Sequence, residues 1–152
     1  MKIKLGIAGL LMTLGLTGCA QMAGTSSPNP EQPGVVISNG RIAVTLDPLY
    51  FKEGPEVKIT WTLLTKGYSF PANGITVDSG TRGGAKGETK TEALSKAAVS
   101  AEFVCMPGTT PQQFVCKNAR TTYGSFKYTV RVLDEKGKEL LPLDPIIVND
   151  WN

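Results

Sequence analysis

Two stretches of this chain alternate strictly between apolar and polar residues, and this pattern constrains the fold more than any other feature. From Val57 to Leu63 every second residue is apolar, and the residues between are Lys or Thr. The same alternation runs from Phe126 to Val132, against Lys, Thr and Arg. Side chains of a β-strand point to opposite faces in turn, so a period of two predicts strands with one face in the core and the other in water. No helical period persists elsewhere, and we therefore expect an all-β domain.

Turn residues separate further expected strands. Asn39-Gly40 lies between two apolar runs, which is the strongest short-range signal for a β-hairpin. The last expected strand contains Pro142 and Pro145, which have no N–H to donate, so it should lie at a sheet edge or carry a bulge. The aromatic residues outside these patterns are expected to cover the ends of the domain, or to form part of an interface. The further strands are expected at residues 35–37, 42–46, 74–77, 99–106, 113–117 and 140–148, and the aromatics outside them include Tyr50, Phe51, Tyr68, Phe70 and Trp151.

Short strands at this spacing, joined by turns, predict a β-sandwich. The run Gly124-Ser125-Phe126-Lys127-Tyr128 resembles the Gly-x-Tyr-x-Cys strand of immunoglobulin-type domains. It departs from that pattern because Phe126 lacks the hydroxyl of the corner Tyr and Tyr128 stands where the inter-sheet Cys would be. Trp61 is a candidate for the buried Trp, although it comes earlier in the chain than that residue should. The expected fold is an all-β, immunoglobulin-like antiparallel β-sandwich.

The N-terminus has the order of a secretory signal. Lys2 and Lys4 precede an apolar run of about 12 residues, which is too short to span a bilayer. The run ends in Leu16-Thr17-Gly18-Cys19, which resembles the lipobox of bacterial lipoproteins. That resemblance implies cleavage before Cys19, acylation of its sulfur with palmitate, and, with Ala20 rather than Asp in the next position, sorting to the outer membrane. The alternative is an ordinary cleaved signal with a coincidental Cys.

These features divide the chain into three parts. Residues 1–18 are the expected signal peptide, and residues 19–34 the lipidated Cys followed by a tether. Ala20 to Gly34 contain three prolines and few apolar residues, so the segment should stay disordered and reach about 45 Å or less. Residues 35–152 are long enough for one β-sandwich domain with a single core.

The three cysteines become an even pair if Cys19 is acylated. Cys105 and Cys116 would then lie in an oxidising envelope compartment and flank a turn that contains Pro107 and Gly108. We expect them to form a disulfide across a hairpin. Redox or zinc chemistry fits less well, because the spacing is not Cys-x-x-Cys and the chain has no His.

Composition argues against several functions. Without Lys2 and Lys4, 14 basic residues face 13 acidic ones, so the mature chain is nearly neutral and no nucleic-acid partner is indicated. The absence of His closes the Ser-His and Cys-His mechanisms, and no Ser stands three residues before a Lys. We expect no catalytic residues, no metal, no cofactor and no small-molecule substrate. The scattered carboxylates are interpreted as ordinary surface: Glu53, Glu56, Glu88, Glu92 and Glu102.

The longest irregular segment runs from residue 79 to 98. Its first half is rich in glycine and basic residues but does not match a phosphate-binding loop, and its second half, residues 89–98, could form a short helix with a Glu92–Lys96 pair. Binding surfaces often lie on loops of a rigid scaffold, so this segment is the candidate partner-binding site. The candidate residues are Gly80, Arg82, Gly83, Gly84, Lys86 and Gly87.

The sequence therefore predicts a non-enzymatic lipoprotein that is anchored to the outer membrane and binds another envelope protein. The alternative is an inhibitor of a lysozyme or protease that acts through the disulfide-braced loop from Met106 to Gln113.

Overall fold

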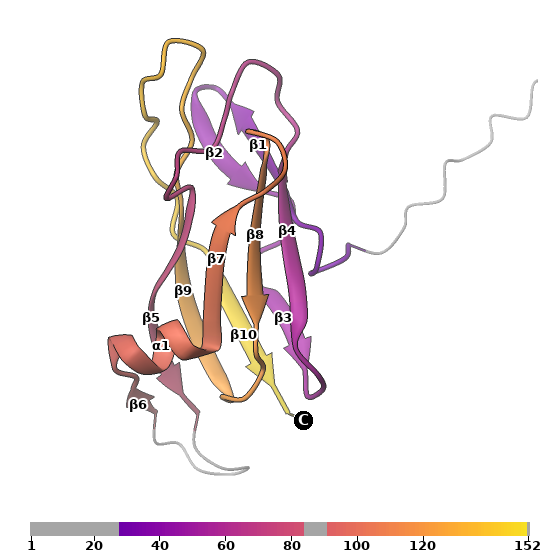
Figure 1. Cartoon of the computed structure of the whole chain (residues 1–152), viewed down its shortest axis with the longest axis vertical. Coiled ribbons are helices and arrows are strands. Elements are labelled where there is room, and N and C mark those ends of the chain that lie inside the picture. Colours follow the sequence, from indigo (N-terminus) through magenta and orange to yellow (C-terminus); the bar gives the residue numbers. More distant parts are fainter. Residues whose placement is uncertain (1–27, 84–90, 152) are drawn as a thin grey trace, which may run out of the picture.

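The computed structural model describes residues 28–83 and 91–151, which form two packed five-stranded sheets (Figure 1). The predicted signal peptide and Cys19 lie outside the described residues. The β-sandwich expected from the sequence is confirmed. The first sheet has the order β2-β1-β4-β8-β7 and the second β3-β10-β9-β5-β6. The elements are β1 Gly34–Ser38, β2 Arg41–Val44, β3 Leu49–Lys52, β4 Val57–Leu63, β5 Ile75–Arg82, β6 Glu92–Ala93, α1 Lys96–Glu102, β7 Phe103–Pro107, β8 Gln113–Asn118, β9 Gly124–Val130 and β10 Ile146–Asp150.

The β1–β2 hairpin confirms the Asn-Gly signal. Asn39 has φ +51° and Gly40 φ +71°, so both central residues of the turn adopt the left-handed conformation. A two-residue type I′ turn requires this conformation, and Asn and Gly reach it at the lowest steric cost. Ser38 faces Arg41 across the turn, which fixes the register of the hairpin.

The first sheet begins before the position expected from the sequence. The carbonyls of Glu31 and Pro33 accept hydrogen bonds of 2.8 and 3.1 Å from the backbone N–H groups of Thr60 and Thr62 in β4. Residues 31–33, which form a turn ahead of β1, are therefore hydrogen-bonded to β4. Only eight residues, 20–27, lie between Cys19 and the first described residue, Pro28.

The expectation of an edge position or a bulge for the last strand is wrong. β10 begins at Ile146, after both prolines, and pairs with β9 on one side and β3 on the other. Because Pro142 and Pro145 precede the strand, they remove no donor from its ladders. β3 was not expected as a strand. It is four residues long and pairs in parallel with β10, about one hundred positions further along the chain.

Most strand pairs are antiparallel, as predicted, but β1–β4 and β3–β10 are parallel. Trp61 of β4 and Tyr128 of β9 are fully buried between the sheets, with ring centroids 5.5 Å apart. In the immunoglobulin-type pattern a Trp packs on an inter-sheet disulfide. Here the Tyr at the Cys position packs on the Trp instead, and the disulfide lies within one sheet.

The expected strand at residues 99–106 is wrong in its first half. Residues 96–102 form α1, and the Ser95 hydroxyl caps it by accepting from the Ala98 N–H at 3.2 Å. The helix that the sequence allowed at residues 89–98 is displaced toward the C-terminus, and Glu92 and Ala93 form the short strand β6 instead. Val99 and Glu102, three residues apart, both point inward from α1. The three-residue spacing of Val99 and Glu102 is typical of one helix face, but two residues in so short a segment are a weak signal. The apolar residues that follow favoured a strand instead.

Candidate functional site

The predicted disulfide between Cys105 and Cys116 is confirmed. The two residues face each other directly in the β7–β8 ladder, and Cys116 is fully buried against the core. The bond therefore joins an edge strand to the interior of its own sheet.

Removing the disulfide should lower the free energy of unfolding. The bond closes a ring of about 12 residues, and the chain-entropy model assigns roughly 3 kcal/mol to a ring of this size. We expect the double variant Cys105→Ala, Cys116→Ala to lose about that amount in equilibrium urea denaturation of the domain. A midpoint equal to that of the unreduced protein would show that the bond does not stabilise this domain.

The loop after β7 is rigidly held, which bears on the inhibitor alternative. The Pro111 carbonyl accepts from the Phe70 N–H at 2.8 Å, and the Gln112 carbonyl accepts from the Leu63 N–H at 2.8 Å. Within the loop, the Gly108 N–H donates to the Gln113 carbonyl at 2.9 Å. The segment from Pro107 to Gln113 therefore presents a preformed conformation supported by its neighbours.

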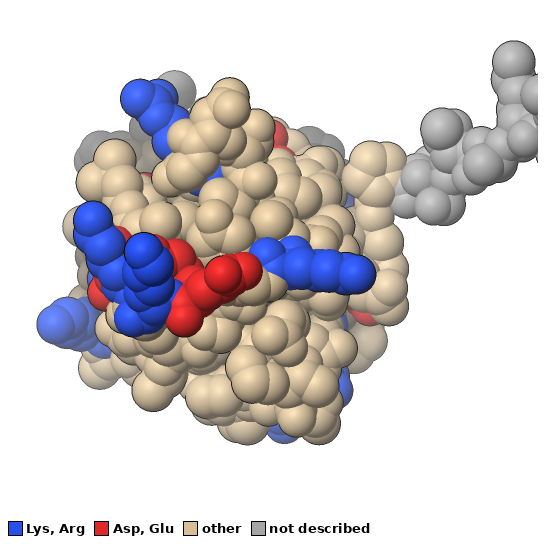
Figure 2. Space-filling model, turned by 90° about the horizontal axis from the view of Figure 1, so that it is seen from above, with Lys and Arg blue, Asp and Glu red and all other residues tan. Residues whose placement is uncertain are grey.

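This loop lies at the same end of the sandwich as the β1–β2 turn, the β4–β5 loop and the β9–β10 loop (Figure 1). Figure 2 shows this end from above: acidic atoms lie between basic atoms, and most of the remaining surface is uncharged. Charges of both signs lie close together at this end, so they produce no extended field of one sign.

The glycine-rich candidate site is only partly described, and its first residues are not in a loop. Gly80 and Arg82 belong to β5, where they face Phe126 and Gly124 of β9. A Cβ on Gly80 would lie 2.5 Å from the Phe126 ring, so the strand depends on a glycine at this position. Gly83 follows the strand and lies against Tyr123. Gly84, Lys86 and Gly87 lie outside the described residues. Shortening this segment from Gly80 would thus remove core packing as well as surface.

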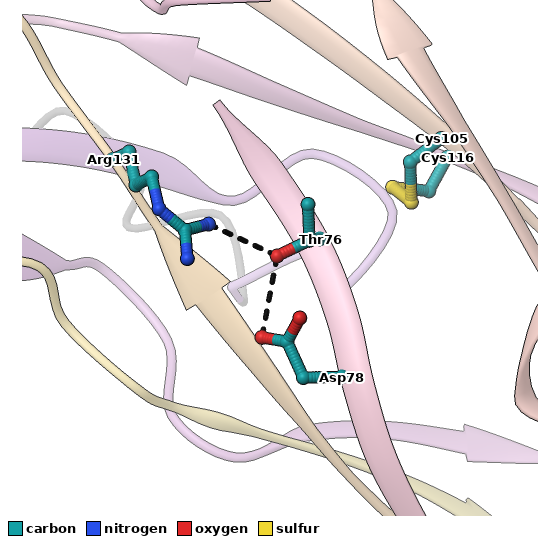
Figure 3. The surroundings of a disulfide bond; sticks show 5 residues. All are labelled: Thr76, Asp78, Cys105, Cys116 and Arg131. Carbon is teal, nitrogen blue, oxygen red and sulfur yellow. Dashed lines mark hydrogen bonds between the residues drawn. A yellow bond between two sulfur atoms is a disulfide. The ribbon is translucent and has the colours of Figure 1, made fainter. Parts of the chain in front are cut away.

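A chain of polar contacts crosses the outer face of the second sheet (Figure 3). The disulfide, which appears in the same view, belongs to the first sheet. The Arg131 guanidinium donates to the Thr76 hydroxyl at 3.0 Å, and that hydroxyl donates to Asp78 at 3.2 Å. The register of β5 against β9 shifts at Asp78, which is the extra residue of a β-bulge. The bulge turns the Asp78 carboxylate onto the same face as Thr76.

Two carboxylates of this chain meet at one hydroxyl. The Thr129 Oγ1 lies 2.5 Å from Asp78 Oδ2 and 2.8 Å from Asp144 Oδ1. A hydroxyl has a single proton, so it donates to one of the two at a time. Lys127 balances the charge through an ion pair of 2.8 Å with Asp144. Hydrogen bonds from Lys127 and Thr129 hold the pKa of Asp144 below its ordinary value, and the bond to Asp144 raises the pKa of Lys127.

This arrangement predicts a pH dependence for the segment before β10. Because the folded-state pKa of Asp144 is lowered, its contribution to stability is present above the unfolded-state value near 3.8 and is lost as the pH falls through the folded value. We expect the Asp144 carboxyl carbon to titrate below 3.8 in an NMR pH series, and Lys127→Met to raise its midpoint. A midpoint unmoved by Lys127→Met would contradict the assigned cause.

The sequence interpretation missed a buried carboxylate. Glu102, expected at the surface, is only 2% exposed. Its oxygens accept from the Thr121 N–H at 2.9 Å, the Thr121 hydroxyl at 2.6 Å and the Asn149 side-chain amide at 3.1 Å. No Lys or Arg of residues 28–83 and 91–151 forms an ion pair with it. Its three-residue spacing from Val99 was the available signal, since both lie on one helix face.

Glu102 belongs to a polar cluster that joins the two sheets. Asn118 at the end of β8 and Asn149 in β10 are fully buried and exchange two hydrogen bonds of 2.8 and 3.1 Å between their side-chain amides. Asn118 also accepts from the backbone N–H of Arg120, which has φ +56°. The cluster is shielded from solvent and its acceptors are occupied, which favours a structural role over a catalytic one.

Within the described ranges, no group of three or more His, Cys, Asp or Glu side chains is placed to hold a metal ion. Nor does that part of the chain contain a helix long and apolar enough to cross a membrane. Neither the known family models nor the curated proteins contain a match to this chain.

Proposed function

We propose that this protein is a non-enzymatic lipoprotein of the bacterial envelope whose β-sandwich binds another envelope protein. The observation that carries the proposal is the sequence Leu16-Thr17-Gly18-Cys19 directly after a short apolar run. Two or more acyl chains on Cys19 would anchor the chain stably, whereas a single chain gives only marginal binding. Ala20 in the next position favours the outer membrane over the inner membrane.

The early start of the folded domain limits its distance from the bilayer. Eight residues lie between Cys19 and Pro28, and even a fully extended chain advances only about 3.3–3.6 Å per residue. The sandwich would therefore stay within about 30 Å of the membrane surface. A partner is accordingly sought among membrane proteins or proteins at the membrane surface.

The anchoring is tested by Cys19→Ala. We expect the wild-type protein to incorporate labelled palmitate and to fractionate with the outer membrane, and the variant to do neither, because its acyl acceptor is gone. Cys105→Ala serves as the control for loss of a cysteine, and it should leave labelling unchanged. Wild-type protein that is unlabelled and recovered in the soluble fraction would refute the anchor.

A second candidate is an inhibitor of a lysozyme or protease. The observation that favours it is the preformed loop from Pro107 to Gln113, since a rigid loop loses little conformational freedom on entering an active site. Assays of the domain against representative lysozymes and proteases separate the two proposals. Stoichiometric inhibition that depends on residues 108–112 would favour the inhibitor over the binding scaffold.

A further inference from the structure

The outer face of the first sheet beside β7 carries exposed apolar side chains. Val104 and Met106, two residues apart on β7, are 50% and 48% exposed. Met106 faces the half-buried Val115 of β8, and Val115 in turn faces Thr60 of β4. These side chains form one continuous surface because directly paired residues of neighbouring strands point to the same face.

Two lysines face each other at one end of this surface. Lys58 of β4 is paired with Lys117 of β8, and Lys117 with Val104 of β7. Lys117 forms an ion pair of 3.4 Å with Glu56, whereas Lys58 has no carboxylate partner in the described part of the chain. Like charges directly opposite on a sheet are destabilising, so the isolated domain gains nothing from Lys58. We name the surface of Lys58, Thr60, Val104, Met106, Val115 and Lys117 the β7 face.

The free edge of β7 is less suited to binding than its face. Cys105 and Cys116 have Cα atoms 4.0 Å apart, which marks a pair without mutual backbone hydrogen bonds, so the N–H and C=O of Cys105 point outward. The Phe103 N–H donates to Val99, however, and Pro107 has no N–H. Cys105 is thus the one residue of the β7 edge with both its N–H and its C=O available to an added strand. A partner would therefore be bound mainly by the side chains of the β7 face.

The outer face of the second sheet also has exposed apolar residues, Tyr50 at 59% and Ile146 at 43%. Lys127 of that face is paired with Asp144, and Lys52 lies directly opposite an acidic residue, Asp150, in the β3–β10 register. On the β7 face, in contrast, the residue directly opposite Lys58 is another cation, Lys117. This difference favours the first sheet and indicates the charge of what it binds.

We propose that the β7 face docks a segment of an envelope protein in which an acidic residue stands beside apolar residues, with Lys58 binding the carboxylate. The inference rests on the proposed function and specifies its surface and the chemistry of its partner. A protein segment fits better than a lipid surface. The face has no Trp or Tyr, which membrane interfaces favour, and its two lysines together with Glu56, the ion-pair partner of Lys117, sum to a single positive charge, which attracts anionic lipid only weakly.

The test is site-specific photo-crosslinking in cells with the full chain. A photoreactive residue at position 106 should form an adduct with an envelope protein, and one at position 50 should not. Mass spectrometry of the adduct should locate Asp or Glu next to apolar residues at the crosslinked site. Adding Lys58→Glu should reduce the yield at position 106 by about tenfold, because attraction becomes repulsion. The matched control Arg41→Glu makes the same charge change on the far strand of the same sheet and should leave the yield unchanged.

The effect of Lys58→Glu on folding distinguishes recognition from structure. Glu at position 58 would oppose Lys117 and replace a like-charge pair with an opposite-charge pair, so the melting temperature should stay the same or rise. Reduced capture by a domain of equal or higher stability supports the inference, while reduced capture with a lower melting temperature overturns it. A lipid adduct at position 106 also overturns it. Adducts confined to residues 109–112 or 82–83 would refute the β7 face and leave the proposed function standing, whereas a palmitate-free protein with no adduct anywhere would count against both.

Discussion

Trp61→Ala is expected to destabilise the domain by about 4–5 kcal/mol, the largest loss for any single truncation considered. The side chain is fully buried between the sheets against Tyr128. Truncation removes its apolar transfer energy and leaves a cavity that two rigid sheets cannot close, and Trp→Ala changes in cores cost about 3–5 kcal/mol. Since a domain of this size has roughly 5–15 kcal/mol of stability, the variant should be marginal. Urea denaturation followed by far-ultraviolet circular dichroism, which does not depend on Trp fluorescence, measures the loss in the free energy of unfolding.

The matched control for this experiment is Tyr128→Phe. Neither the Trp61 indole nitrogen nor the Tyr128 hydroxyl has a hydrogen-bond partner within the described chain. Burial raises the pKa of Tyr128, and the Trp61 indole N–H opposes the shift. Because this hydroxyl contributes no bond of normal geometry, its removal should change the free energy of unfolding by less than about 1 kcal/mol. A loss as large as that of Trp61→Ala would mean that the hydroxyl is bonded in solution.

Glu102→Ala is expected to cost about 3–4 kcal/mol. The substitution leaves the Thr121 N–H and the Thr121 hydroxyl without the acceptor they share and opens space beside α1, while the Asn149 amide keeps Asn118 and the Thr122 carbonyl as acceptors. A buried donor without a partner costs about 1–3 kcal/mol, and hydrogen bonds to a charged acceptor are worth more than neutral ones. The free energy of unfolding of the variant, compared with wild type in the same urea series, gives the result.

Two further variants show whether the carboxylate or its shape matters. Glu102→Gln keeps one oxygen acceptor in the same volume, so it should cost less than half as much as Glu102→Ala. Glu92→Ala removes an exposed acid from the neighbouring strand β6 and should change stability by less than about 0.5 kcal/mol. Equal costs for all three substitutions would contradict the buried cluster.

The polar cluster also explains how the sandwich keeps its two sheets in register at the α1 end. Glu102 precedes β7 of the first sheet, Asn118 ends β8, and Asn149 belongs to β10 of the second sheet. Directional bonds between these side chains permit few relative positions of the sheets. This rigidity would keep the β7 face and the preformed loop, both on the first sheet, in fixed positions relative to the second sheet.

The local sequence determined those elements whose signals are contained within the element. Alternation predicted β4 and most of β9, Asn39-Gly40 predicted the first hairpin, and Cys105 and Cys116 predicted the β7–β8 pair. Each of these signals needs only neighbouring residues: the two-residue period of a strand, the φ preference of a turn, or the reach of a disulfide. The lipobox resemblance likewise lies within a few residues, and it stays a prediction.

The tertiary structure decided what depends on distant partners. β3 has only four residues and forms because β10 supplies a parallel neighbour from the other end of the chain. The sequence predicted Glu102 at the surface, but it is buried and hydrogen-bonded to Thr121 and Asn149. It predicted Gly80 in a loop, but Gly80 lies in β5 against the Phe126 ring. Lys58 is an ordinary surface residue until the β4–β8 register places Lys117 opposite it. Burial and charge pairing are properties of contacts between strands, and the order of strands across a sheet is set by how the whole core packs, which no single segment contains.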